Sequence, residues 1–311
     1  MNSLDTLQQL LSVFWLRPET AMWRELDIQA MRKFLMVEPS LDLGCGDGVF
    51  SFIRAGGEFE SSFDVFEDIT DTRKYYEGRD IFDTFTNKKN NFVKKVPDYK
   101  ISVGFDHKEN LLKKANQLGF YKNTIQGNAN TKLPFPDESF RSIFSNIVYW
   151  LNSPKLALHE IGRVLMPGGS ACIMLPNKSL VEYSFFENFY NKTKNQKWKF
   201  LEKIDRNRFS ENIKHAKSFE EWSKLVNDSG LKIERHTMHL SKPIIQIWDI
   251  GMRPIFPLLL ECMNSVGLEK KLEIKKDWIK TMIEFLEPLT NLDSELISSY
   301  GAGFHCFQLR K

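Results

Sequence analysis

Residues 41–48 read LDLGCGDG, a short apolar run followed by three glycines at alternate positions. A strand that ends in such a run has to turn sharply, and glycine lets the main chain, rather than side chains, approach a ligand there. A dinucleotide-binding fingerprint would need glycine or alanine at the sixth position counted from Gly44. Val49 stands there instead, so the spacing disfavours a turn that holds the pyrophosphate of a nicotinamide dinucleotide.

Strand-like and helix-like segments alternate on the C-terminal side of this turn. Strands are expected at 40–43, 101–105, 123–126, 142–146, 170–175, 231–238 and 303–309. Helices are expected from Val49 onward, over 108–119 with Gly119 as C-terminal cap, from Pro154 to about 165, and from the capping box of Ser218 and Glu221 to Gly230. This alternation predicts an α/β fold with a mostly parallel sheet.

A further helix is expected before the first strand, over residues 19–36. Six apolar side chains recur there at helical spacing and predict one core-facing stripe: Trp23, Leu26, Ala30, Met31, Phe34 and Leu35.

Four segments, taken in order, resemble one known family. The pattern D-x-G-x-G-x-G of residues 42–48 is followed by QGNA at 126–129 with LPF at 133–135, FSNIVYW at 144–150 and HEIGRVLMPGG at 159–169. Residues 40–177 thereby resemble the class I S-adenosylmethionine-dependent methyltransferases, in particular the type 11-like group that acts on small molecules. The resemblance implies a Rossmann-like, mostly parallel sheet with a reversed last strand and helices on both faces. It also implies S-adenosylmethionine as the cofactor.

The resemblance assigns cofactor binding to the turn and to the ends of the following strands: Asp42, Gly44, Cys45, Gly46, Gly48, Asp106, His107, Asn128, Ala129, Ser145 and Asn146. In the family an acidic residue at the end of the second strand holds the two ribose hydroxyls, and a carboxylate offers two acceptor oxygens for them. Asp106 is favoured for this role. Asp64, 20 residues after Gly44, is the alternative, but residues 60–63 make a poor strand.

Asn128 departs from the aspartate that the family has more often at this position. Its amide both accepts and donates hydrogen bonds, so recognition of the adenine amino group and a ring nitrogen is still expected. The plain alternative is a turn-forming asparagine.

The implied reaction is an in-line displacement at a sulfonium methyl group, in which positioning of the reactants can contribute about 7–11 kcal/mol. Tyr149, with Trp150 beside it, and Trp248 are candidates for an aromatic face toward the sulfonium. His215 is the candidate general base by residue type. Arg206 and Arg208 could hold an anionic group of the acceptor. Core packing remains the plain alternative for the aromatic residues, and a surface position for His215. For Arg206 and Arg208 the alternative is pairing with the acidic insertion.

The expected organisation has four parts. Residues 1–38 form an N-terminal helical cap, and 39–240 with 301–311 form the methyltransferase domain. Choosing Asp106 implies an insertion at 59–98, and residues 241–300 form a helical insertion or lid.

Two segments carry opposite charge. Residues 58–83 hold nine acidic and three basic residues, a balance of −6, whereas residues 191–217 hold nine basic and three acidic residues, a balance of +6. We hypothesise that the two segments face each other across the cofactor site, although most charge runs are merely solvated surfaces.

Composition restricts the function further. The chain of 311 residues has a formal net charge of +3, which disfavours a dedicated nucleic-acid binder. Its four cysteines lack ligand spacing, so no metal site is expected. Neither a signal peptide nor a transmembrane segment is predicted. A cytoplasmic enzyme fits best, acting on a small acceptor that is free or linked to a glycan or a lipid. The alternatives are an RNA or protein methyltransferase, which would use the basic segment, and a non-catalytic assembly module that only binds the cofactor.

Overall fold

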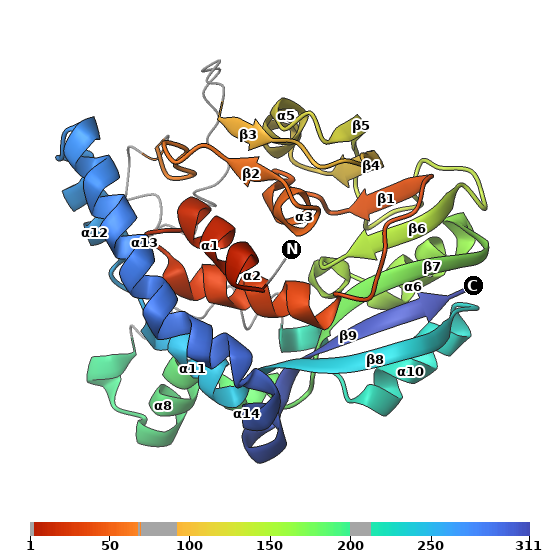
Figure 1. Ribbon diagram of the computed structural model, residues 1–311. Coiled ribbons are helices and arrows are strands. Elements are labelled where there is room, and N and C mark those ends of the chain that lie inside the picture. The colour runs from red at the N-terminus through yellow and green to blue at the C-terminus, as the bar shows by residue number, and fades with distance from the viewer. Residues whose placement is uncertain (1–2, 68, 70–91, 200–212) are drawn as a thin grey trace.

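A seven-stranded sheet forms the centre of the computed structural model, which describes residues 3–67, 69, 92–199 and 213–311 (Figure 1). Its strands are β1 (Ser40–Leu43), β4 (Ile101–Asp106), β5 (Tyr121–Gln126), β6 (Phe140–Ser145), β7 (Leu165–Pro176), β8 (Lys232–Ser241) and β9 (Ala302–Arg310). The strand order is β5-β4-β1-β6-β7-β9-β8. The first five of these strands pair in parallel, and β9 is antiparallel to both β7 and β8. The expected mostly parallel sheet with a reversed last strand is confirmed.

Strand β1 lies at the point where the order of the sheet reverses. It pairs with β4 on one side and with β6 on the other. In open α/β sheets, ligands bind outside the carboxyl ends of the strands at such a switch point. The fold therefore directs attention to the segments that follow β1, β4 and β6.

Alternate side chains of the strands fill two separate cores. Leu41, Ile143 and Ile173 point to one face, where α6 (Pro154–Val164) and α10 (Phe219–Asp228) cover them. Phe144 and Met174 point to the opposite face, toward the end of α2 (Pro18–Ala30). This period of two is the pattern that a sheet covered on both faces requires.

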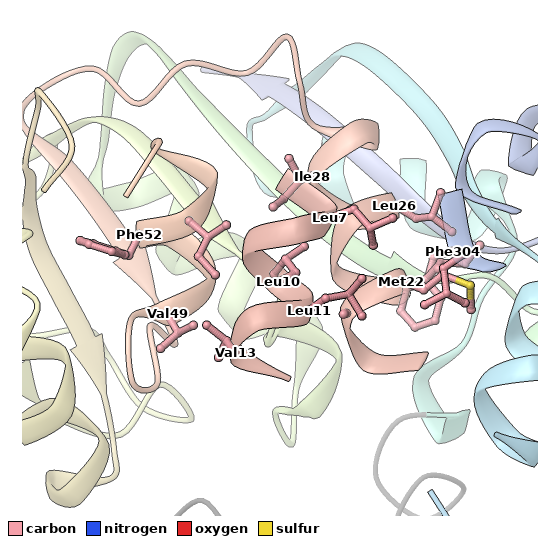
Figure 2. Close-up of a cluster of buried hydrophobic side chains, with 14 of the residues drawn as sticks. Leu7, Leu10, Leu11, Val13, Met22, Leu26, Ile28, Val49, Phe52 and Phe304 are labelled. Carbon is pink, nitrogen blue, oxygen red and sulfur yellow. The ribbon is translucent and has the colours of Figure 1, made fainter. Parts of the chain in front are cut away.

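The N-terminal helices pack onto the helix that follows the glycine-rich turn. Helix α1 (Ser3–Val13) contributes Leu7, Leu10 and Leu11 to a core shared with Val49 and Phe52 of α3 (Val49–Arg54), and Figure 2 shows Val13 of α1 close to Val49. Met22 and Leu26 of α2 join the same core. Helix α1 thus lies between α3 and the more C-terminal helices.

The helix expected over 19–36 is shorter than predicted, since α2 ends at Ala30 and Leu35 is 72% exposed. The backbone N–H of Val37 donates to the Ser142 hydroxyl at 2.8 Å. The chain is therefore already held along β6 at residue 37, and residues 31–36 have to turn into β1. Tertiary packing overrides the helical spacing here.

Most element boundaries agree with the sequence. The Ser153 hydroxyl accepts from Leu156 N, the capping box of Ser218 and Glu221 is complete, and Gly119 and Gly230 have φ angles of +63° and +77°. Strand β7 begins earlier than expected, at Leu165. Phe140 pairs with Leu165 and Ser142 already pairs with Ser170, so residues 166–169 form an irregularity within the strand.

Two additions surround the sheet. Strands β2 (Glu58–Phe59) and β3 (Val93–Lys95) pair as a separate antiparallel hairpin. Residues 242–300 form α11 (Lys242–Ile250), α12 (Phe256–Asn264), α13 (Leu268–Asn291) and α14 (Asp293–Tyr300). The remaining helices of more than one turn are α5 (Glu109–Gln117), α7 (Leu180–Tyr183) and α8 (Phe185–Thr193) within the described ranges.

The two additions are tied together. The Lys275 ammonium group of α13 donates to the backbone carbonyls of Ser61 and Phe63, and Lys271 pairs with Asp64 at 2.9 Å.

Among the described residues, none of the helices combines the length and apolar character needed to cross a bilayer.

Candidate active site

The glycine-rich loop between β1 and α3 has a left-handed backbone at all three glycines, with φ angles of +82°, +57° and +76° at Gly44, Gly46 and Gly48. A Cβ atom at Gly44 would lie 2.3 Å from Ile147, and one at Gly48 would lie 2.6 Å from the Tyr121 ring. At Gly46 the nearest atom would be 4.0 Å away. Protein packing therefore explains Gly44 and Gly48, whereas Gly46 leaves room for a ligand.

Four backbone N–H groups of this loop are committed within the protein. Gly44 and Cys45 donate to the Phe105 carbonyl at 2.7 and 3.1 Å, Gly46 donates to the Asp106 carboxylate at 3.0 Å, and Gly48 donates to the Cys45 carbonyl at 3.0 Å. The Asp47 carboxylate accepts from Val49 N, at the start of α3. A pyrophosphate needs free N–H donors at such a loop. The hydrogen bonding of the loop therefore disfavours a dinucleotide, as does the spacing of its glycines.

Asp42 lies in β1 and is 2% exposed. Its carboxylate accepts a 2.7 Å hydrogen bond from the Tyr121 hydroxyl of β5. Burial raises the pKa of Asp42 to about 6, although hydrogen bonds from Ser51 and Tyr121 act in the opposite direction. Asp42 therefore acts as a buried hydrogen-bond acceptor beneath the loop. Burial also raises the pKa of the Cys45 thiol well above its usual value, with the nearby Asp42 and Asp106 charges adding to the effect.

Asp106 ends β4 directly beside the loop. Its two oxygens accept from Gly46 N at 3.0 Å and from Lys108 N at 2.9 Å. An ionised carboxylate has about four acceptor positions, so two remain for a pair of hydroxyls. His107 is 69% exposed, with its Nδ1 atom 3.4 Å from Asp106. Asp64, the alternative, instead pairs with Lys271 of α13. Position and acceptor capacity both fit a ribose at Asp106.

The segment after β5 approaches Asp106 through a 3.0 Å hydrogen bond from Gly127 N to the Asp106 carbonyl. The Asn128 side-chain oxygen accepts from the backbone and the side chain of Asn130, at 2.9 and 3.1 Å. The expected acceptance from an adenine amino group would therefore need the second lone pair of that oxygen. Its amide nitrogen has no hydrogen-bond partner among the described residues and is the more available group. Ala129 is half-buried in the same turn.

The end of β6 completes this edge of the sheet. The Ser145 hydroxyl is buried and donates to the Leu43 carbonyl at 2.9 Å, so its side chain links the ends of β6 and β1. The half-buried Asn146 follows it. Because the Ser145 hydroxyl is committed within the sheet, Asn146 is the remaining candidate for ligand contact at this strand end.

Tyr149 and Trp248, far apart in sequence, enter one aromatic cluster. Phe304 of β9 lies 5.7 Å from Tyr149 and 5.4 Å from Trp23, measured between ring centroids, and Trp23 lies 5.2 Å from Trp248. The Arg253 guanidinium lies 4.5 Å from the centroid of the Trp248 ring. Sequence reasoning missed Phe304 and assigned Trp23 to the core; no sequence signal joins β9 to this cluster, because the pairing of β9 with β7 is non-local.

His215 lies at the same side of the sheet. It ends a short 3-10 turn (Ile213–His215), and two residues later Lys217 N donates to the Pro176 carbonyl at the end of β7. Burial lowers the pKa of His215, and the charges of Lys214 and Lys217 lower it further, against a hydrogen bond with the Leu151 backbone. Its Nε2 atom is buried without a hydrogen-bond partner among the described residues. The Leu151 backbone group bonded to His215 lies two residues after Tyr149 in the chain.

The predicted roles of Arg206 and Arg208 and of the two charged segments depend largely on residues that the structure does not describe. Arg206 and Arg208 lie outside the described residues, as do residues 68 and 70–83 of the acidic segment and residues 200–212 of the basic segment. Of the acidic segment, Glu58 pairs with Lys94 at 2.8 Å and Asp64 with Lys271 at 2.9 Å. These two acids therefore do not face the basic segment; for the remaining charges the hypothesis stays a prediction.

Comparison with known proteins gives one family match. A family model described as a methyltransferase domain matches residues 90–173, from just before β3 into β7. The glycine-rich loop precedes the matched segment, which begins within the insertion predicted at 59–98. No curated protein matches the chain.

Several solved structures are similar. A methyltransferase of Thermotoga maritima that depends on S-adenosylmethionine has 18% identity and a TM-score of 0.42, over 73% of this chain and 77% of that chain. One from Mesorhizobium loti has 14% identity and a TM-score of 0.44, over 92% and 96%. The cyclase SpnF has 13% identity and a TM-score of 0.47, over 94% and 82%. Likenesses this distant carry no conclusion about the chemistry of this chain.

The strand order fits a Rossmann-like sheet, and residues 90–173 match the methyltransferase domain family. These findings imply an S-adenosylmethionine-dependent methyltransferase. The loop, in which four backbone N–H groups are already bonded within the protein, fits that nucleoside better than a pyrophosphate.

Proposed function

We propose that the chain methylates a small-molecule acceptor and that the carboxyl ends of β1, β4 and β6 hold the cofactor. The observation that carries this proposal is the hydrogen bond of 3.0 Å from Gly46 N to Asp106, which joins the one loop glycine with open space to the one strand-end carboxylate with spare acceptor positions. Asp106 would accept the ribose hydroxyls. The Asn128 amide and the segment at Ala129 would face the adenine.

When bound, S-adenosylmethionine supplies an activated methyl group on a sulfonium. This chain's part is then to position the acceptor, to exclude water and to receive a proton. The cluster of Tyr149, Trp23, Trp248 and Phe304 offers aromatic faces, which attract cations and exclude water. His215 would accept the proton of a hydroxyl or amine acceptor, because its lowered pKa keeps the imidazole neutral near pH 7.

A small acceptor is supported by how this aromatic cluster is covered. Trp23 comes from the N-terminal helix α2, and Trp248 comes from α11 in the region that follows β8. Elements outside the parallel part of the sheet therefore enclose the place where an acceptor would meet the cofactor. Specificity in shared folds resides in such added elements.

Cofactor binding is tested by calorimetry with S-adenosylhomocysteine. The wild type is expected to bind, and Asp106→Ala should lower the affinity by at least about tenfold, since it removes a charged acceptor. Asp64→Ala is the matched control and should leave the affinity unchanged. Equal affinity of wild type and Asp106→Ala would refute the assigned ribose site.

The acceptor class is tested with S-adenosylmethionine labelled in the methyl group. The purified protein is incubated with cell extract separated into small molecules, lipids, glycans, RNA and protein. Label is expected in the small-molecule, lipid or glycan fraction, and label only in RNA or protein would overturn the proposal. A protein that binds the cofactor but labels no fraction would support the assembly-module alternative.

RNA methylation is the second candidate, and one observation favours it. Trp198 is 37% exposed and packs against Phe189 in a tilted arrangement, with 4.9 Å between ring centroids. Four exposed lysines lie within the same stretch: Lys192, Lys194, Lys197 and Lys199. Bases stack on such exposed aromatic rings next to basic side chains. Trp198→Ala would then weaken RNA binding while leaving affinity for S-adenosylhomocysteine intact.

A further inference from the structure

A cavity of about 780 Å³ lies between α1, the β2–β3 hairpin and α13. Its volume is within the range of about 300–1,000 Å³ that is usual for small-molecule sites. All of its lining residues belong to α1, to the hairpin and the two residues after β2, or to α13. The cavity is thus built entirely by elements outside the seven-stranded sheet.

Helix α1 separates this cavity from the glycine-rich loop. Its polar residues Gln8, Gln9 and Ser12 line the cavity. Its apolar residues pack instead with Val49 and Phe52 of α3, the helix that begins directly after Gly48 (Figure 2). Helix α1 therefore presents one face to the cavity and another to α3, which follows the loop.

The cavity carries an excess of positive charge. Four lysines line it, against two glutamates: Lys94, Lys275, Lys276 and Lys280, and Glu60 and Glu273. Several of these charges are already used within the protein. Lys94 pairs with Glu58 at 2.8 Å, and Glu273 pairs with Lys270 at 2.7 Å. Lys275 donates to two backbone carbonyls, and burial lowers its pKa to about 8.

Lys276 and Lys280 differ from the other two lysines. Both are exposed, and neither forms an ion pair with a residue that the structure describes. They lie four residues apart on α13, so their ammonium groups share one face of the helix. Two adjacent, uncompensated ammonium groups suit one anionic head group of a ligand.

The uncharged part of the lining combines apolar side chains with polar ones: Phe59, Leu272, Ile279 and Ile283, and Gln8, Gln9, Ser12 and Ser61. Phe59 is 4% exposed, and Ile279 and Ile283 lie on the same face of α13 as the two lysines. The side-chain oxygen of Gln9 is buried and makes no hydrogen bond with the described residues. An occupant with an apolar body would suit the aliphatic and aromatic part of this lining, and an anionic head would face the lysines.

We propose that this cavity binds an amphipathic anion, an alkyl chain that ends in a carboxylate or a phosphate. The head group would lie between Lys276 and Lys280, and the chain would lie along Phe59, Ile279 and Ile283. The site is separate from the cofactor site and does not depend on the identity of the methyl acceptor.

The experiment is calorimetry with decanoate, decyl phosphate and decanol, below the concentration at which they form micelles. Both anions are expected to bind at one site per chain, and decanol at least about tenfold more weakly, since loss of a charged contact has this effect. The doubly substituted Lys276→Gln/Lys280→Gln variant should lower anion affinity by at least about tenfold and leave that for S-adenosylhomocysteine unchanged. Lys224→Gln/Lys232→Gln removes the same charge from α10 and β8 and is the matched control.

A third variant, Ile279→Trp, should fill the cavity and weaken the binding of all three compounds. Three results would overturn the proposal: no saturable binding of either anion, equal affinity in the Lys276→Gln/Lys280→Gln variant and its control, or competition of decanoate with S-adenosylhomocysteine. Vesicles of phosphatidylcholine with and without phosphatidic acid distinguish the source of the ligand. Binding to acidic vesicles that requires Lys276 and Lys280 would indicate a membrane lipid, and its absence a free amphiphile.

Discussion

The Tyr121 hydroxyl donates a hydrogen bond of 2.7 Å to the Asp42 carboxylate, and both groups are buried beneath the glycine-rich loop. The Tyr121 ring occupies the space that Cβ atoms at Gly48 and Gly104 would enter, at 2.6 and 2.8 Å. Tyr121 thereby couples β5, at the edge of the sheet, to the loop after β1. The conformation of the loop depends on this packing as well as on its own glycines.

The buried Asp42 should make stability depend on pH. Its pKa is about 6 in the folded state and ordinarily 3.8. Because the folded state favours the protonated carboxyl, this contribution is fully present below pH 3.8 and is lost as the pH rises to about 6. The loss amounts to about 3 kcal/mol. Asp42→Asn keeps an acceptor for Tyr121 and removes the titration.

Urea unfolding of the wild type and Asp42→Asn between pH 4 and pH 7 measures this difference. The variant should gain stability relative to the wild type by about 2 kcal/mol over that interval, because part of the total is already lost at pH 4. A constant difference at all pH values would mean that Asp42 is not the titrating group.

Two glycines of the loop should respond differently to alanine. Gly46→Ala adds a methyl group in open space and strains a left-handed residue by about 1–2 kcal/mol, so the protein should still fold. Gly44→Ala would place a methyl group 2.3 Å from Ile147 and should destabilise the protein far more. Thermal unfolding compares the two stabilities. Calorimetry with S-adenosylhomocysteine should show that Gly46→Ala, although folded, has lost affinity.

Local signals in the sequence were enough to predict several helix boundaries. Ser153, the box of Ser218 and Glu221, and Gly230 act within one turn of the chain, and each ends or begins a helix where expected. The end of α2 was predicted wrongly, because the hydrogen bond from Val37 to Ser142 is non-local. Helical spacing in residues 31–36 carries no information about that contact.

The site was predictable only in part, for the same reason. Asp106 could be placed because it follows an alternating strand. The partnership of Tyr121 with Asp42 spans 79 residues, and Phe304 reaches Tyr149 only through the pairing of β9 with β7. The cavity beside α1 needs three segments at once, so no single stretch of sequence indicates it.

Arg163 of α6 should matter for the segment after Asn128. Its guanidinium donates to the carbonyls of Phe135 and Leu133 at 2.8 and 3.1 Å, and its Nε atom donates to Glu160 at 2.9 Å. Lysine cannot reproduce this planar fork. Arg163→Lys should therefore lower the free energy of unfolding by about 1–3 kcal/mol, measured with urea. Exposed Arg235→Lys is the control, and equal stabilities of the two variants would contradict the proposed role of the fork.

His215 should determine the acidic limb of the pH–rate profile. Burial and the neighbouring lysines lower its pKa, so the imidazole is neutral and able to accept a proton at pH 7. The apparent kcat/KM of methyl transfer should fall only below the ordinary histidine pKa of about 6.5. His215→Gln should remove this limb and lower the rate by about 10²–10⁴-fold, the usual contribution of a general base. Transfer of labelled methyl into the active extract fraction measures both. His159→Gln, on the exposed side of α6, should leave the profile unchanged; a His215→Gln variant with the wild-type profile would exclude the imidazole as the base.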